Sequence, residues 1–149
     1  MSRKPADEST RPSHAALAVV LQVRDGVLQV LLWQRARPPF EGSWALPGGL
    51  LAPSETLEES IRRHLVAKVD VRELAHLEQL ETLSDPDRHP REWQLATAYV
   101  GLVPADVDPA VPGDTAWRSY PAGTSFEVPG KSGFDVKAAT AVAYLCEFL

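Results

Sequence analysis

The sequence of 149 residues has almost no cysteine, because Cys146 stands alone. One cysteine allows no internal disulfide, and we therefore expect a protein of the reducing cytoplasm. Cys146 lies in an apolar stretch near the C-terminal end, which favours a buried, unreactive thiol over a nucleophile.

Positive charge and long apolar runs are also scarce. Fifteen Lys and Arg stand against twenty Asp and Glu, a net charge of -5. Proteins that bind nucleic acids or membrane surfaces normally present a basic face, so this balance argues against both partners. No apolar run is long enough to cross a bilayer, and the first 13 residues lack the apolar core of a signal peptide. A few local basic groups can still bind a phosphorylated small molecule.

The order of the predicted elements indicates one domain of the α/β class. Residues 1–13 are polar and predict a flexible tail, and residues 14–149 predict a single domain. Asp25-Gly26 is a strong hairpin signal between two apolar runs. We expect a mixed β-sheet sandwiched between helices. The predicted strands are 15–23, 27–32, 44–46, 74–83, 93–103 and 115–118, and the predicted helices are 55–68 and 134–149.

The stretch from residue 46 to residue 71 has the most local structure. Gly48 and Gly49 follow a short strand, and we expect positive φ angles there and a close approach of the backbone to a ligand. Ser54 follows a proline and is predicted to cap the helix that comes next. The helix ends at residues 69–71 without a glycine, which predicts an irregular turn.

The spacing within this stretch resembles the Nudix box. Gly49 is followed by Glu55 six residues on, by Arg63 eight residues further, and then by Leu65 and Val71, all in the register of that motif. The resemblance implies the Nudix fold, with Glu55 near the helix start in contact with Arg63. It also implies a pyrophosphate-containing substrate and, in active members, Mg²⁺ or Mn²⁺.

Segments outside the box resemble one branch of this family. They are the Trp44–Gly49 segment, the hairpin followed by Arg35 and Arg37, and the loop and strand of residues 85–104. They are similar to the ADP-ribose pyrophosphatases and to regulators of NAD metabolism that carry a Nudix domain. For a chain of this branch the resemblance implies a nucleotide ligand such as ADP-ribose, and a homodimer.

The box departs from its family pattern at the positions that hold metal. Where the motif has three glutamates, this chain has His64, Ala67 and Lys68, and Asp70 replaces a glycine. A helix advances about 100° per residue, so positions 64, 67 and 68 share one arc on which glutamates would hold divalent cations. Glu58 and Glu59 lie roughly 120° or more from position 64 and cannot simply substitute. Glu59 is expected to pair with Arg63 on the helix surface. The sequence therefore predicts a poor site for Mg²⁺.

The replaced positions suggest a role in ligand binding as well as the loss of metal ligands. The ammonium of Lys68 can stand in for part of the missing cation and pair with a ligand phosphate, which favours binding over hydrolysis. The alternative is a solvated lysine on a decayed site. Arg35 and Arg37 are either phosphate contacts or ordinary surface arginines. Our candidate catalytic residues are Glu55, Arg63 and His64, with Glu55 the candidate metal ligand; the candidate ligand-binding residues are Arg35, Arg37, Gly48, Gly49 and Lys68.

Three functions follow from these residues. The first is a domain that binds a nucleoside diphosphate-linked metabolite, with hydrolysis lost or strongly reduced and no need for a metal cofactor. The second is an active hydrolase that has rebuilt its metal site from Glu55, Glu58, Glu92 or Glu127. The third, expected only if the chain is a piece of a longer one, is the ligand-sensing part of a regulator of NAD metabolism. The regulators carry a further winged-helix region, and we expect direct DNA binding to be absent from a chain of this length.

Overall fold

The computed structural model describes residues 11–36, 41–42, 44–86 and 93–119. The predicted helix 134–149, most of the predicted tail, and Arg37 lie outside these residues. The described elements are β1 (Ser13–Arg24), β2 (Val27–Gln34), β3 (Trp44–Ala45), β4 (Gly48–Leu50), α1 (Leu57–Val69), β5 (His76–Leu83), β6 (Gln94–Leu102) and β7 (Thr115–Ser119).

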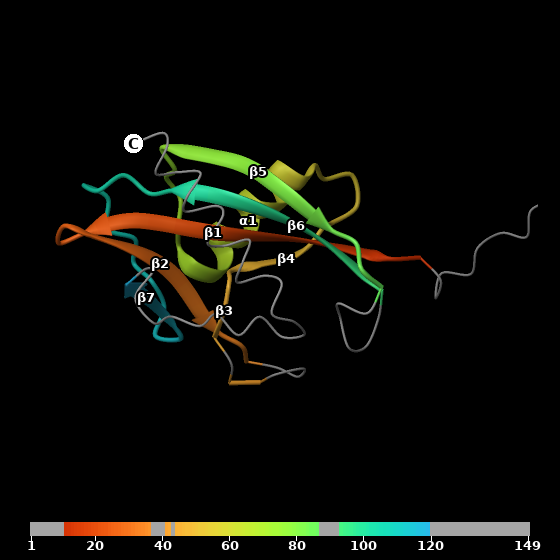
Figure 1. The fold of residues 1–149 in the computed structure, drawn as a ribbon, viewed down its shortest axis with the longest axis horizontal. Helices are drawn as coiled ribbons and strands as arrows, with labels where there is room; N and C mark the ends of the chain where they lie inside the picture. Colours follow the sequence, from red (N-terminus) through yellow and green to blue (C-terminus); the bar gives the residue numbers. More distant parts are fainter. Residues whose placement is uncertain (1–10, 37–40, 43, 87–92, 120–149) are drawn as a thin grey trace, which may run out of the picture.

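The long strand β1 organises the sheet, whose main order is β3-β2-β1-β6-β5 (Figure 1). One edge of β1 pairs in parallel with β6 over nine positions, from Ser13 to Leu21. The other edge is shared: Ala15–Leu17 pair with β4, and Leu21–Arg24 pair with β2, both antiparallel. The sheet is thus mixed, as the sequence predicts. The first half of β1 carries β4, the strand that leads into the box helix.

The hairpin between β1 and β2 confirms the Asp25-Gly26 prediction. Asp25 (φ 52°) and Gly26 (φ 74°) both have positive φ, and Arg24 pairs with Val27, so the loop has two residues. That geometry belongs to the type I′ turn, which matches the twist of the paired strands. Along most of β2, residues Gln29–Trp33 pair with β7, which confirms the predicted edge strand near residue 115.

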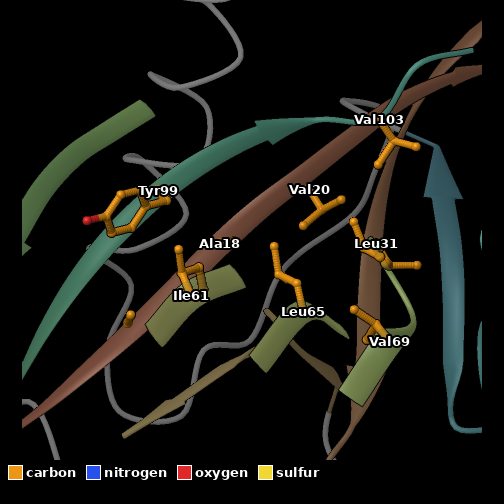
Figure 2. Packing of buried hydrophobic residues seen from close by; sticks show 10 residues of the cluster. Ala18, Val20, Leu31, Ile61, Leu65, Val69, Tyr99 and Val103 are labelled. Atoms are coloured by element: carbon orange, nitrogen blue, oxygen red, sulfur yellow. The ribbon is translucent and has the colours of Figure 1, made fainter. Parts of the chain in front are cut away.

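Helix α1 covers one face of the sheet through a single apolar stripe. Ile61, Leu65 and Val69 recur every four residues, are fully buried, and point toward the strands (Figure 2). They pack on side chains of β1, β2 and β6: Ala16, Ala18, Val20, Leu31 and Tyr99. Burying one such aliphatic side chain is worth about 1.5–3 kcal/mol, so the stripe fixes the rotation of the helix. Positions 64 and 68 are therefore held at the edge of the stripe, facing β4 and β2.

The other face of the sheet has a second buried cluster. Alternate residues of β1, such as Val19 and Leu21, point away from α1 and pack with Val30, Leu46 and Val100. Both faces of β1 are thus apolar, which explains why its sequence is a continuous apolar run rather than an alternating one.

Most predicted elements are present, with changed ends. β1 begins two residues before the predicted start, and β2 extends to Gln34. The segment predicted as one or two strands after residue 74 is a single strand, β5, with an irregularity between Gln79 and Glu81.

Candidate functional site

Gly48 and Gly49 lie in β4, which corrects the expectation of a turn with positive φ. Neither has a positive φ, and both pair with β1. They are required for close packing instead. A Cβ on Gly48 would overlap the Ala16 carbonyl oxygen and lie 2.9 Å from the Leu17 Cα. A Cβ on Gly49 would overlap the imidazole of His64, with Nδ1 2.7 Å away. The two glycines bring the backbone against β1 and against the helix.

The N-terminus of α1 is capped by Thr56, which corrects the prediction of Ser54. Thr56 is extended, and its hydroxyl accepts a hydrogen bond from the Glu59 N–H at 3.1 Å. The Glu59 carboxylate accepts in turn from the Thr56 N–H at 3.2 Å, which completes a capping box. Ser54 has a φ of 61° and lies in the turn before the helix. The expected Glu59–Arg63 pair is replaced by this cap.

The C-terminus of α1 explains the residue that replaces the box glycine. Asp70 adopts the left-handed conformation (φ 55°, ψ 30°), a position that favours glycine. Its N–H bonds to the Leu65 carbonyl, and its carboxylate accepts from Arg72 at 2.8 Å and from the Ala110 N–H at 3.1 Å. Asp tolerates this conformation when its side chain bonds locally. The helix end is thus a regular cap, which corrects the predicted irregular turn.

Glu55 and Arg63 form the ion pair that the family resemblance implies. The Arg63 Nε lies 2.7 Å and its Nη2 2.9 Å from the two Glu55 oxygens, a bidentate contact. The Ala52 N–H donates to the same carboxylate at 3.1 Å. Arg63, and next the Ala52 N–H, lower the pKa of Glu55 from 4.5 to about 2. Glu55 is accordingly a firmly ionised group that ties the β4–α1 loop to the helix.

This pair predicts a specific acid dependence of stability. Because the pKa of Glu55 is lower in the folded chain, its stabilising effect is complete above about pH 4.5 and disappears as the pH falls to about 2. We expect Glu55→Gln to flatten the loss of stability across that range, measured as the urea midpoint at each pH. The matched control is Glu58→Gln, which removes a carboxylate paired with Arg62 on the exposed side of α1 and should keep the slope. A Glu55→Gln curve parallel to the wild-type curve would contradict the prediction.

His64 packs against β4 rather than facing solvent. Its side chain lies over Gly49, and the residue is only 8% exposed. Its Nε2 lies 2.8 Å from the Leu50 carbonyl oxygen, an acceptor, so Nε2 carries the hydrogen. Burial lowers the pKa of His64. His64 is therefore a neutral imidazole that holds β4 to α1.

Lys68 lies between β4 and β2. Its Nζ donates to the Gly48 carbonyl oxygen and stands 4.9 Å from the centre of the Trp33 ring, a cation–π distance. Burial lowers the pKa of Lys68, and the nearby charges of Arg35 and Arg63 lower it further. The ammonium of Lys68 is thus bonded to β4 and lies over the Trp33 ring, rather than being fully solvated as in the alternative interpretation.

We call this cluster the α1–β4 site: Gly48, Gly49, Leu50, Glu55, Arg63, His64 and Lys68, with Trp33 and Arg35 beside it. It unites all the predicted site residues that the structure describes. The sequence did not indicate Trp33 or the Leu50 carbonyl. Trp33 follows Leu31 by two residues on β2 and shares its face, a period-2 signal that could have placed it toward the helix.

The Nudix resemblance implies Mg²⁺ or Mn²⁺ in active members, and the donor set of the α1–β4 site does not fit either ion. These ions require several oxygen ligands, preferably carboxylates. The site has one carboxylate, Glu55, and it is engaged by Arg63. Of the rebuilt-site candidates, Glu58 pairs with Arg62, and Glu92 and Glu127 lie outside the described residues. Throughout the described ranges no three Asp, Glu, His or Cys residues are grouped to hold a metal ion.

Comparison with known proteins identifies the family. Residues 12–123 match the family model of the NUDIX domain, and the chain belongs to the Nudix family. The fold supports this, because solved Nudix proteins superimpose on it. The NUDIX domain of Shewanella oneidensis NrtR, solved in complex with ADP-ribose, aligns with a TM-score of 0.65 and 30% identity, over 77% of this chain and 79% of that one.

Two curated relatives match shorter parts. The ADPR-responsive transcriptional repressor NtrR of Acinetobacter baylyi is 34% identical over 86 residues, which are 56% of this chain and 34% of the repressor. A pyrimidine/purine nucleoside phosphorylase of Sorangium cellulosum is 72% identical over 39 residues, which are 26% of this chain and 42% of the phosphorylase. The chain spans less than half of each of these two relatives. In the part of the chain that the structure describes, no helix is long and apolar enough to cross a membrane.

Proposed function

We propose that this Nudix domain binds a nucleoside diphosphate linked to a second group, such as ADP-ribose, and that pyrophosphate hydrolysis is lost or strongly reduced. One observation carries the proposal: the helix face that should present metal-binding carboxylates presents His64 and Lys68, which donate to the backbone of β4. The NrtR domain that binds ADP-ribose shares 30% of its aligned residues with this chain.

The α1–β4 site has the chemistry to hold a diphosphate without performing hydrolysis. Guanidinium and ammonium groups pair with phosphate oxygens by charge-assisted hydrogen bonds. They cannot generate hydroxide from water as a bound metal does. Losing an essential metal ligand removes several kcal/mol of transition-state stabilisation, on the order of 10³ in rate or more.

The direct test uses ADP-ribose with Mg²⁺ or Mn²⁺ and measures AMP release. We expect release at the background rate, because no described group of residues can assemble the metal centre. Calorimetric titration of ADP-ribose in EDTA should meanwhile show binding. Robust metal-dependent release of AMP would instead establish the rebuilt hydrolase. Comparison of Glu55→Gln with Glu58→Gln would then show which carboxylate holds the metal.

The regulator hypothesis concerns the use of the same binding event. Similarity to NtrR and NrtR supports a ligand-sensing role in which ADP-ribose binding is the signal. DNA binding by this chain is not part of the proposal, because its net charge is -5. We also propose a homodimer and a cytoplasmic location. The family resemblance supports the first, and the single cysteine supports the second. Light scattering of the purified chain tests the dimer.

Phosphorolysis of nucleosides is a second candidate function. It is favoured by the 72% identity over 39 residues with the Sorangium phosphorylase, although this covers under half of that protein. The test is incubation with a nucleoside and inorganic phosphate. Release of the free base would support this candidate, and no release would leave the binding domain as the proposal.

A further inference from the structure

The oxygen atoms that a cation would need in the α1–β4 site already accept hydrogen bonds from basic side chains. The Gly48 carbonyl accepts from Lys68. The Leu50 carbonyl accepts from His64 at 2.8 Å and from Arg63 at 3.3 Å. Both carboxylate oxygens of Glu55 accept from Arg63. To bind here, a divalent cation would have to displace these donors.

The charges of the site oppose a cation as well. Arg63 and Lys68 contribute two positive charges, against the single negative charge of Glu55, and His64 is neutral. Burial lowers the pKa of Lys68 most, and the charges of Arg35 and Arg63 lower it further, so both guanidinium groups lie within electrostatic reach of the ammonium. An anion that joins this cluster relieves mutual repulsion, whereas a divalent cation increases it.

The form of the ligand follows from these two features. Free diphosphates bind Mg²⁺ in solution, and the resulting complex has part of its charge neutralised and keeps several waters on the ion. N–H donors of guanidinium and ammonium groups recognise bare phosphate oxygens and are repelled by the metal. The site thus distinguishes the metal-free ligand from its magnesium complex by charge and by donor chemistry.

We infer that the α1–β4 site selects the metal-free form of a nucleoside diphosphate ligand, so that divalent cations oppose its binding by competing for the ligand. The inference rests on the proposed function and reverses the metal dependence that Nudix hydrolases generally have. Divalent cations act here on the ligand in solution, and the protein responds to the concentration of free diphosphate that they leave.

The experiment is a calorimetric titration of ADP-ribose into the whole chain, first in EDTA and then at increasing MgCl₂. The ionic strength is kept constant with NaCl, because a cationic site is also weakened by salt. If only the free ligand binds, Mg²⁺ multiplies the apparent Kd by a factor. This factor is one plus the ratio of the Mg²⁺ concentration to the Kd of the Mg²⁺–ADP-ribose complex. A protein-free titration gives that second Kd. At ten times this value the apparent Kd should be about 11-fold higher.

A matched probe separates competition for the ligand from other effects of Mg²⁺ on the protein. Calcium chloride, at concentrations that sequester the same fraction of ADP-ribose, should raise the apparent Kd by the same factor. A rise that follows the sequestered fraction for both ions supports the inference.

Three other results would contradict either the inference or the proposed function. An apparent Kd that stays constant as Mg²⁺ rises would overturn the inference and leave the proposed binding function standing. A lower Kd with Mg²⁺ would overturn the inference in favour of a rebuilt metal site. No binding in EDTA and none with Mg²⁺ would overturn the proposed function itself.

Discussion

Lys68→Glu is expected to weaken metal-free ADP-ribose binding by at least about 100-fold, or about 2.7 kcal/mol. The substitution exchanges a positive for a negative charge on the side of α1 that faces β4, within electrostatic reach of Arg63 and Arg35. Two unit charges 4 Å apart interact by about 4 kcal/mol at the effective dielectric of a protein surface. The change removes one attraction to the diphosphate and adds one repulsion, so even a strongly screened interaction gives the expected effect. Titration calorimetry in EDTA measures it.

The same substitution should reverse the effect of magnesium. A carboxylate introduced at position 68, on the helix face beside Glu55, restores part of the oxygen donor set that divalent cations require. We therefore expect Lys68→Glu to bind ADP-ribose more tightly when Mg²⁺ is added, whereas the wild-type protein binds it less tightly. A general effect of salt cannot make Mg²⁺ weaken binding to the wild-type protein and strengthen binding to Lys68→Glu.

Two control variants separate charge from packing. Lys68→Met keeps an unbranched side chain over Trp33 and loses only the ammonium, and we expect about 10-fold weaker binding with no response to added metal beyond that of the wild type. Arg62→Glu makes the same change of charge on the exposed side of α1, where Arg62 pairs with Glu58. It should alter the Kd by less than about twofold. If Lys68→Glu binds as tightly as the wild type in EDTA, Lys68 has no part in the site.

Sequence patterns were sufficient where the structure depends on neighbouring residues. Asp25-Gly26 predicts its hairpin because a two-residue loop with positive φ angles has few alternatives. The register of the box predicts that Glu55 and Arg63 meet, and they do. Helical spacing places residues 64 and 68 on one face, and the apolar stripe of α1 turns that face toward β4.

Sequence patterns failed where a residue had several partners within reach. Glu59 has two partners within reach, Arg63 one turn ahead and the Thr56 N–H one turn behind. Its carboxylate accepts from the Thr56 N–H, because a free backbone N–H at a helix start needs an acceptor. Ser54 and Thr56 are both capping residue types, and only the backbone conformation decides between them. The pattern predicts positive φ angles at the glycines of β4, whereas the structure uses them for contacts with β1 and His64 that are distant in sequence.

Gly48→Ala is expected to lower the free energy of unfolding by about 3 kcal/mol or more. The added methyl group would overlap the Ala16 carbonyl oxygen and meet the Leu17 Cα at 2.9 Å. Both are backbone atoms of the central strand β1, so they cannot move without breaking the β1–β4 pairing. Urea unfolding followed by circular dichroism measures the loss. Gly113→Ala, at a glycine with open space around its Cα, should stay within about 0.5 kcal/mol of the wild type.

Gly49→Ala tests the adjacent contact and, unlike Gly48→Ala, should be reversible by a second substitution. Its methyl group would overlap the His64 imidazole, which is a side chain and can be removed by substitution. We expect a loss of about 1–3 kcal/mol for Gly49→Ala alone. In Gly49→Ala/His64→Ala the cause of the clash is gone, so the double variant should be more stable than the sum of the two single changes by about 1 kcal/mol or more. His64→Ala should give no such rescue of Gly48→Ala, whose obstacle is the backbone of β1. Strictly additive changes at residues 49 and 64 would mean that the imidazole does not pack on β4, and the neutral, helix-bracing role of His64 would then be wrong.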